Sequence, residues 1–404
     1  MNQANQFLTI AINDLVPGMY VVAVLKQKGR VEIKTEGWVR TEAIIQQLKQ
    51  KGVLELLIDP SKSLQQPSEN QPAPFEAVQP AGPGSKKNRV IPYSEELGQA
   101  QVLYQQAKGL QKKAFADIQA GRPLMLQPFQ DCANGMIESV FRNQDALLCM
   151  SRIREKDAYL LEHSVNVSIL MTIFAKQMGF EQELIQQLAT GALLHDMGKI
   201  KVPDHILNKP GRLDPDELQE MRNHVLYSFE LLEAVPGLSP VSIDVAAVHH
   251  ERLDGKGYPL GLKDQQISVY GRMIAIVDTY DAITATRCYK EGQSGITALK
   301  IMKKESHSYD QELLSQFIQA IGIHPVGTLV KLKSQKLAIV LRANKTDPLR
   351  PVVKVFYHTK FRHYLEVQEL DLAQAKVDDE IEAAVMPEDF GIDLMRFFRQ
   401  SVLQ

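Results

Sequence analysis

The sequence is short of cysteine, and the cysteines that it has are not spaced for pairing. The chain has 404 residues and three cysteines, Cys132, Cys149 and Cys288, none of which forms a Cys-x-x-Cys pair. This excludes a disulfide framework and a zinc ribbon, and it favours a reducing compartment. Long apolar runs are also missing, since no stretch approaches the roughly 18 residues of a membrane span. The first twelve residues do not resemble a secretory signal. We therefore expect a cytoplasmic protein with no membrane span.

An excess of positive charge is absent as well. The formal net charge is −2 and the sequence pI is about 6.6. This argues against a nucleic acid polymer as the partner, although a local cluster of cations could still bind a small anion. Hydrophobic residues make up 44% of the chain, which is enough to build real cores, and the length predicts two or three domains.

The hydrophobic pattern predicts a mainly α-helical protein with β structure at both ends. Five segments are expected in chain order: a small α+β domain at 1–60, a linker rich in Pro, Gln and Ser at 61–92, a helical connecting segment or dimerising hairpin at 93–150, a helical core at 151–328, and a small β appendage with a weakly patterned tail at 329–404. In the first segment we expect strands near 7–10, 19–25 and 53–58, and a helix at 41–51 that ends at Gly52.

Residues 214–217 are typical of a helix start. Asp214 can cap the helix, Pro215 fits its first position, and Glu217 can reach back to close a capping box. We expect one helix to follow. Its buried stripe would consist of Leu218, Met221, Val225, Phe229 and Leu232, with His224 at the edge of that stripe.

Two histidine-rich pieces of the helical core stand out chemically. His195 and Asp196 end an apolar helix expected at 184–194, and His249 and His250 end another apolar run. A polar pair at the end of a buried helix is costly unless something satisfies it, and a metal ion does so. Neighbouring helical residues point about 100° apart. The two adjacent histidines therefore serve one pocket only if the pocket holds more than one metal or if the helix stops there.

A lone acid, Asp278, follows an apolar run at 273–277. It could form an ion pair with Arg272 or Arg287, or it could bind a metal. A carboxylate that bridges two metals allows hydroxide to form at neutral pH and clamps a phosphorus centre, so the grouping predicts a metal-dependent phosphodiesterase. The remaining histidines outside this grouping are expected to be ordinary core or surface residues: His205, His307, His324, His358 and His363.

The ordered motifs between residues 150 and 328 resemble the HD-GYP phosphodiesterases, a bacterial branch of the metal-dependent HD superfamily. The motifs that carry the resemblance are His195-Asp196, Gly198-Lys199-Ile200, the segment 203–211, Gly257-Tyr258-Pro259, the segment 278–282 and the segment 287–290. The first domain is similar to an uncharacterised domain that often precedes HD-GYP modules. The resemblance implies an all-helical HD-superfamily core.

The resemblance also implies a metal site. Its ligands would be His163, His195, Asp196, His224, His249, His250 and Asp278, with Asp196 as the bridge. Some family members hold a third metal through a glutamate four residues before the first histidine. Tyr159 stands at that position here, which favours two divalent ions. Iron is the first expectation and manganese the second, while cobalt, nickel and zinc also suit imidazole and carboxylate ligands.

The resemblance further implies that cyclic di-GMP is opened to linear pGpG, with GMP as a further product, by a hydroxide held between the metals. Lys199 would contact a phosphate oxygen or assist the leaving group, and Asp196 and Lys199 are the catalytic candidates. Arg287 and Lys290 would hold the phosphates, and Tyr258 would stack on a guanine or bond a phosphate. The simpler interpretation of Lys199, Arg287 and Lys290 is that they are surface cations. The simpler interpretation of Tyr258 is that its ring packs on the loop. Cys288 replaces the usual proline of this loop.

Two other functions stay open from the sequence. The substrate could be another cyclic dinucleotide, such as cyclic GMP-AMP, because no residue clearly reads a guanine edge. The chain could also be a receptor that binds a cyclic dinucleotide without cutting it, although no ligand of the two-metal set is missing. A homodimer, and a signalling protein bound through the HD-GYP surface or the N-terminal domain, are further expectations.

Overall fold

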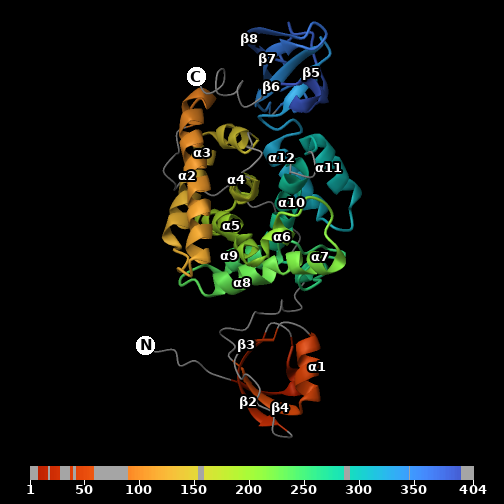
Figure 1. Ribbon diagram of the computed structural model, residues 1–404. Helices are drawn as coiled ribbons and strands as arrows, with labels where there is room; N and C mark the ends of the chain where they lie inside the picture. Colours follow the sequence, from red (N-terminus) through yellow and green to blue (C-terminus); the bar gives the residue numbers. More distant parts are fainter. Residues whose placement is uncertain are drawn as a thin grey trace. The chain divides into compact units, whose positions relative to one another are not determined.

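The computed structural model divides the chain into two compact units. It describes residues 8–16, 19–27, 37–39, 42–58, 90–152, 159–285, 292–344 and 346–392. The first unit spans Met1–Ala81 and the second spans Gly82–Gln404 (Figure 1). The expected linker lies outside the described residues up to position 89, as do Arg287 and Lys290. In the part of the chain that is described, no helix combines the length and the apolar character that crossing a bilayer requires.

The first unit is a small antiparallel sheet with one helix, as expected. The sheet has the order β1-β4-β2-β3, with strands β1 (Leu8–Ala11), β2 (Tyr20–Gln27), β3 (Gly37–Trp38) and β4 (Val53–Ile58). A short 3-10 turn, η1 (Ile12–Asp14), follows β1. Gly52 ends helix α1 (Glu42–Gln50) with a φ of 78°. Ile45 of α1 and Leu56 of β4 lie in the same buried cluster, which closes one face of the sheet.

The second unit is predominantly helical, which confirms the predicted fold class. Its α-helices are α2 (Tyr93–Gln119), α3 (Gln127–Met150), α4 (Tyr159–Gln177), α5 (Gln182–Leu194), α6 (Asp204–Leu207), α7 (Pro215–Arg222), α8 (His224–Glu233), α9 (Pro240–Val248), α10 (Val269–Thr284), α11 (Gly295–Lys304) and α12 (Gln311–Ile321). The 3-10 turns are η2 (Met197–Lys201), η3 (Asp264–Gln266) and η4 (Pro387–Phe390).

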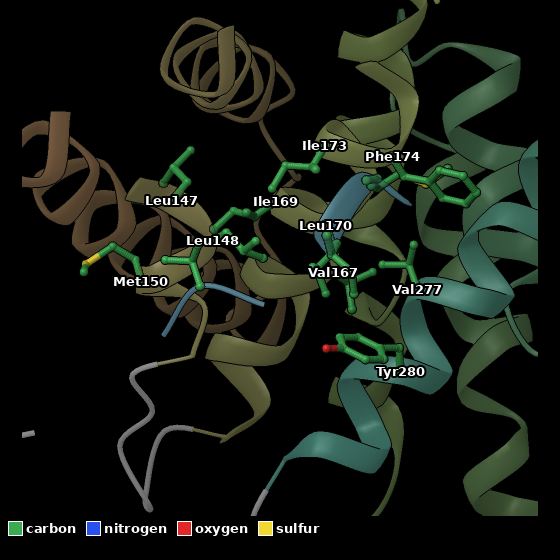
Figure 2. Close-up of a cluster of buried hydrophobic side chains, with 14 of the residues drawn as sticks. Leu147, Leu148, Met150, Val167, Ile169, Leu170, Ile173, Phe174, Val277 and Tyr280 are labelled. Atoms are coloured by element: carbon green, nitrogen blue, oxygen red, sulfur yellow. The ribbon is translucent and has the colours of Figure 1, made fainter. Parts of the chain in front are cut away.

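Helix α4 forms the centre of this unit. From Glu162 to Ala175 every residue is buried, so the helix is enclosed on all sides and shows no single apolar stripe. Val277 and Tyr280 of α10 lie against α4 near Val167 and Leu170 (Figure 2). This packing holds α4 and α10 side by side, and both helices carry side chains of the candidate site.

The hairpin of α2 and α3 is part of this helical body, although the sequence indicated only a connecting layer or a dimerising hairpin. The two helices run side by side and are separated by a turn at residues 120–126 (Figure 1). Polar side chains of α2 contact the site-bearing helices. Tyr104 donates to Asn166, Lys108 pairs with Glu162 at 2.8 Å, and Gln111 donates to the carbonyl oxygen of Leu193. Helix α2 therefore contacts α4 and α5 through these side chains.

The helix expected after residue 214 differs from the prediction in one respect. The capping box of Asp214 and Glu217 is present, and Pro215 occupies the first turn. However, the helix is interrupted at Asn223, which divides it into α7 and α8. Helix α7 has no buried residue, so the predicted stripe is wrong there and Leu218 is 41% exposed. His224 is the first residue of α8, and its side chain is buried.

The C-terminal sheet is larger than predicted. Its order is β8-β7-β6-β5-β9, and all neighbours are antiparallel. The strands are β5 (Leu329–Leu332), β6 (Lys336–Arg342), β7 (Val352–His358), β8 (His363–Asp371) and β9 (Ile381–Ala384). The first three were expected, whereas β8 and β9 fall in the predicted tail. Residues on both faces of β8 are exposed or only partly buried, so neither face carries a row of buried side chains.

Candidate metal centre

Seven side chains singled out by the sequence come together where several helices meet. They are His163 in α4, His195 directly after α5, Asp196 before η2, His224 at the start of α8, His249 and His250 directly after α9, and Asp278 in α10. Six of them are buried, and the side chain of His250 is 25% exposed. The termination of α9 at Val248 is what allows two adjacent histidines to face one site.

Asp196 lies between two groups of possible ligands. Its Oδ1 atom is 3.3 Å from Nε2 of His224 and 3.8 Å from Nε2 of His249. Its Oδ2 atom is 3.4 Å from Nε2 of His195 and 3.6 Å from Nε2 of His163. One carboxylate therefore presents a separate oxygen to each group, which is the geometry of a bridging ligand.

Each group is completed by one further side chain. Asp278 Oδ1 lies 2.9 Å from Nε2 of His163 and 3.9 Å from Nε2 of His195. The His250 ring is tilted against that of His249 with ring centroids 4.1 Å apart, and its Nδ1 atom is 3.3 Å from Asp278 Oδ2. The donor atoms of His224, His249 and His250 lie within 4.8 Å of one another, and so do those of His163, His195 and Asp278.

Backbone carbonyls fix the orientation of three of these rings. Nδ1 of His195 lies 2.7 Å from the carbonyl oxygen of Ala192, and Nδ1 of His249 lies 2.8 Å from that of Ala246. Nδ1 of His224 contacts the carbonyl oxygen of Met221 in the same way. A carbonyl only accepts, so each Nδ1 carries the hydrogen and each Nε2 keeps a lone pair directed into the site.

Asp281 orients the fourth ring, and the sequence analysis assigned it no role. Its Oδ2 atom lies 2.7 Å from Nδ1 of His163, whose Nε2 atom points at Asp278. This carboxylate-imidazole pair is typical of histidines that bind metals. The signal that could have found it is the spacing Asp278-x-x-Asp281, because residues three apart share one helix face.

The charges of the site suit a cation. Burial opposes the ionisation of both carboxyls, but His195, Lys199 and His224 hold the pKa of Asp196 well below its usual range. His163 and His250 do the same for the pKa of Asp278. Burial lowers the pKa of His249 and His250, which keeps both rings neutral. Burial opposes the charged form of His163, but hydrogen bonds to Asp278 and Asp281 raise its pKa to about 9, so this ring gives up a proton when it binds a metal. Anionic carboxylates beside neutral imidazoles are the forms that bind divalent metals.

Among the seven side chains of the cluster, two buried atoms lack a hydrogen-bond partner, namely Nε2 of His195 and Oδ1 of Asp196. A buried polar atom without a partner is costly, and both atoms point into the centre of the cluster. The donor set holds nitrogen and oxygen and no thiolate. These observations together fit divalent metal binding.

Two glycines allow the backbone to approach this centre closely. A Cβ atom on Gly198 would lie 2.1 Å from the carbonyl oxygen of His224, so only glycine lets η2 pack on α8. A Cβ atom on Gly257 would lie 2.6 Å from the carbonyl oxygen of His250. Gly257 therefore allows the loop to fold back, so that the backbone N–H of Tyr258 donates to the same carbonyl at 3.2 Å.

The expected substrate contacts are only partly described. Lys199 is close to the cluster, with Nζ 2.5 Å from Asp196 Oδ2. The Tyr258 ring lies 4.7 Å from the His250 ring, and burial raises the pKa of its hydroxyl, so the phenol stays protonated. Arg287 and Lys290 lie outside the described residues, and their roles stay predictions.

The sequence analysis considered an ion pair of Asp278 with Arg272 or Arg287, and the pair with Arg272 is wrong. Arg272 pairs with Asp310 at 3.2 Å, and Asp278 contacts histidines instead. The other histidines lie outside the ligand cluster. His205 and His307 are exposed, and His324 is buried elsewhere. His358 and His363 belong to the C-terminal sheet.

Glu251 is a second residue that the sequence analysis missed. It is buried and accepts hydrogen bonds from the backbone N–H groups of Leu260, Gly261 and Leu262. Glu251 follows His250 directly, so its hydrogen bonds attach the loop that contains Tyr258 to the end of α9. The loop is thereby held against the metal ligands.

Comparisons with known proteins identify two domains and several relatives. The sequence model described as "HD domain" matches residues 148–313, and that of "Domain of unknown function (DUF3391)" matches residues 8–129. The relative named cyclic di-GMP phosphodiesterase PA4108, from Pseudomonas aeruginosa, is 36% identical over 344 residues, which cover 84% of this chain and 82% of the relative. The fold and the site define an HD-domain protein.

Two further relatives match shorter parts of the chain. A protein named cyclic di-GMP phosphodiesterase from Thermotoga maritima is 31% identical over 52% of this chain and 55% of the relative. A protein named 3'3'-cGAMP-specific phosphodiesterase 1 from Vibrio cholerae is 37% identical over 40% of this chain and 37% of the relative. With the long match to the Pseudomonas relative, the chain belongs to the HD-GYP family of phosphodiesterases.

Proposed function

We propose that this chain hydrolyses cyclic di-GMP to linear pGpG at the histidine and aspartate cluster. The observation that carries the proposal is Asp196, whose two oxygens face two separate groups of ligands. The long match to a relative named as a cyclic di-GMP phosphodiesterase supports the choice of substrate. Hydrolysis onward to GMP is a further step that we leave as a prediction.

The same arrangement supports two divalent ions. His163, His195, Asp278 and Oδ2 of Asp196 would hold one, and His224, His249, His250 and Oδ1 of Asp196 would hold the other. When bound, a metal pair lowers the pKa of water and neutralises the charge that develops on a phosphoryl group. The donor set favours iron, with manganese as the alternative and cobalt, nickel or zinc as further candidates.

The protein side chains then bind and orient the substrate. Lys199 lies at the rim of the cluster with its side chain 15% exposed, so its ammonium group can reach a phosphate oxygen or the departing oxygen. Because the pKa of Tyr258 is raised, its hydroxyl acts as a hydrogen-bond donor and not as a base. Arg287 and Lys290 are proposed to hold the phosphates, as the sequence predicts.

Two alternatives are distinguished by experiment. A relative specific for cyclic GMP-AMP matches 40% of the chain, so this substrate is tested beside cyclic di-GMP. A receptor without activity is disfavoured, since all seven predicted ligands converge. The expected cytoplasmic location, a homodimer and a signalling partner remain predictions.

The test is turnover by protein purified without oxygen and loaded with Fe(II) or Mn(II). Wild type should convert cyclic di-GMP to pGpG, which chromatography resolves. Asp196→Ala should abolish the reaction, and the control Asp216→Ala, which removes an exposed acid from α7, should retain it. Faster turnover of cyclic GMP-AMP would establish the first alternative. Tight binding of cyclic di-GMP without turnover by metal-loaded protein would establish the second.

A further inference from the structure

An arginine that the sequence analysis did not assign lies beside the cluster. Arg222 is the last residue of α7 and stands two positions before His224. Its guanidinium carbon lies 5.2 Å from the centroid of the Tyr258 ring. The same tyrosine ring is 4.7 Å from His250 and 6.4 Å from His224. Arg222 is therefore placed next to the group formed by His224, His249 and His250.

The charge of Arg222 is available for a ligand. The residue is exposed, and no carboxylate of the described residues pairs with it. Lys199 differs in this respect, because its ammonium group contacts Asp196. Lys201 and Lys209, which follow Lys199 in the chain, are also paired, with Glu230 and Glu217. Arg222 is thus an uncompensated positive group beside the metal ligands.

The surface under Arg222 is held in place. The backbone of Tyr258 is bonded to His250, and Glu251 ties down the loop that follows. A guanidinium stacked on a fixed aromatic ring keeps its N–H fork free at its edges. Less side-chain freedom is then lost on binding than for a lysine at the same place. The site suits a planar, bidentate contact with a phosphate.

We propose that Arg222 binds the second phosphodiester of the substrate, the one that is not cut. This inference rests on the proposed function. A cyclic dinucleotide carries two phosphodiester groups in one ring, and only one of them can occupy the metal centre at a time. The other carries a full negative charge, and Arg222 is placed to contact it from the side of His224 and His250. This contact adds to those proposed for Arg287 and Lys290.

The test compares two substrates that differ in their number of phosphates. Bis(4-nitrophenyl) phosphate has a single phosphodiester, so it reports the metal centre alone. Arg222→Ala should raise the KM for cyclic di-GMP by about tenfold or more, as expected for a charge-assisted contact, and change kcat by less than about twofold. Its rate on bis(4-nitrophenyl) phosphate and its metal content should equal those of wild type.

Two further variants sharpen the result. Arg222→Lys keeps the charge and loses the fork, so its KM should lie between those of wild type and Arg222→Ala. Lys113→Ala removes an exposed cation from α2 and should leave both substrates unaffected. An unchanged KM in Arg222→Ala overturns the proposal. Equal losses on both substrates, or a loss of bound metal, also overturn it, because they indicate a purely structural role.

Failure of the proposed function gives a different pattern. Wild type would then cleave bis(4-nitrophenyl) phosphate, or bind metal, without cutting cyclic di-GMP. In that case the dissociation constant of cyclic di-GMP for metal-loaded protein, measured by calorimetry, takes the place of KM. A dissociation constant about tenfold higher in Arg222→Ala would still support the contact. An equal dissociation constant, or no binding by wild type, would overturn it.

Discussion

At the scale of single residues, the site depends on which imidazole nitrogen faces inward. Carbonyl oxygens hold Nδ1 of His195, His224 and His249, and a carboxylate holds Nδ1 of His163. Every one of these contacts turns Nε2 toward Asp196 or Asp278. The protein's own hydrogen bonds therefore orient these four rings.

Asp281 gives the sharpest test of this orientation. Asp281→Asn removes the negatively charged carboxylate that lies beside Nδ1 of His163. The change should weaken the affinity for metal about 10- to 100-fold with little loss of helix content. Calorimetric titration with Mn(II) measures the affinity. Asp204→Asn changes an exposed acid and serves as the control. Equal affinities in the two variants would show that Asp281 does not support the ligand.

Gly198 is a second residue whose effect can be predicted. Gly198→Ala places a methyl group 2.1 Å from the His224 carbonyl oxygen, so it should destabilise the second unit by about 3 kcal/mol. Gly109→Ala is the matched control, since nothing lies within 4 Å of its Cβ and alanine favours the helix by about 0.5–1 kcal/mol. Chemical denaturation compares the two. Similar stabilities would contradict the close approach of η2 and α8.

At the scale of helices and strands, five of the seven ligands lie at helix ends, whereas His163 and Asp278 lie within α4 and α10. The sequence could predict this because polar pairs after apolar runs mark both the end of a buried helix and an unsatisfied group, as at His195 and His249. It could not place Asp281 or Arg222, whose contacts depend on how α10 packs on α4 and how α7 meets the Tyr258 loop. Strand β8 was missed because neither face is buried.

Helix α2 provides a prediction at this scale. Lys108 and Glu162 form an ion pair in which the side chains are only 11% and 2% exposed. Lys108→Met would leave Glu162 buried beside His163 without this partner and should cost about 3 kcal/mol of stability. Lys112→Met, on the exposed side of α2, should cost nearly nothing. If Lys108→Met left the free energy of unfolding unchanged, the hairpin of α2 and α3 would not be a structural part of the core.

At the scale of the whole molecule, the chain joins two units of different kinds. The match to the domain of unknown function runs from residue 8 to residue 129, so it includes α2 of the helical unit. The boundaries at residues 60, 92, 150 and 328 remain sequence predictions. A fold class dominated by helices could be predicted from periodicity, whereas the packing of one face of α2 against the helices of the site could not.

Metal binding should stabilise the second unit. A metal at 100 times its dissociation constant adds about 2.7 kcal/mol to the free energy of unfolding. The midpoint temperature of thermal unfolding should therefore rise when Mn(II) is added and fall back when the metal is removed by a chelator. Asp196→Ala should remove the shift, whereas Asp216→Ala should keep it. A shift of equal size in Asp196→Ala would place the metal elsewhere.

The most direct test of the account is a titration of metal-free protein with Mn(II) or Fe(II), followed by the rate of pGpG formation from cyclic di-GMP. Two ions bridged by Asp196 predict that the rate rises until two equivalents per chain are bound and then stays constant. Full activity with one equivalent, or without metal, would contradict the account.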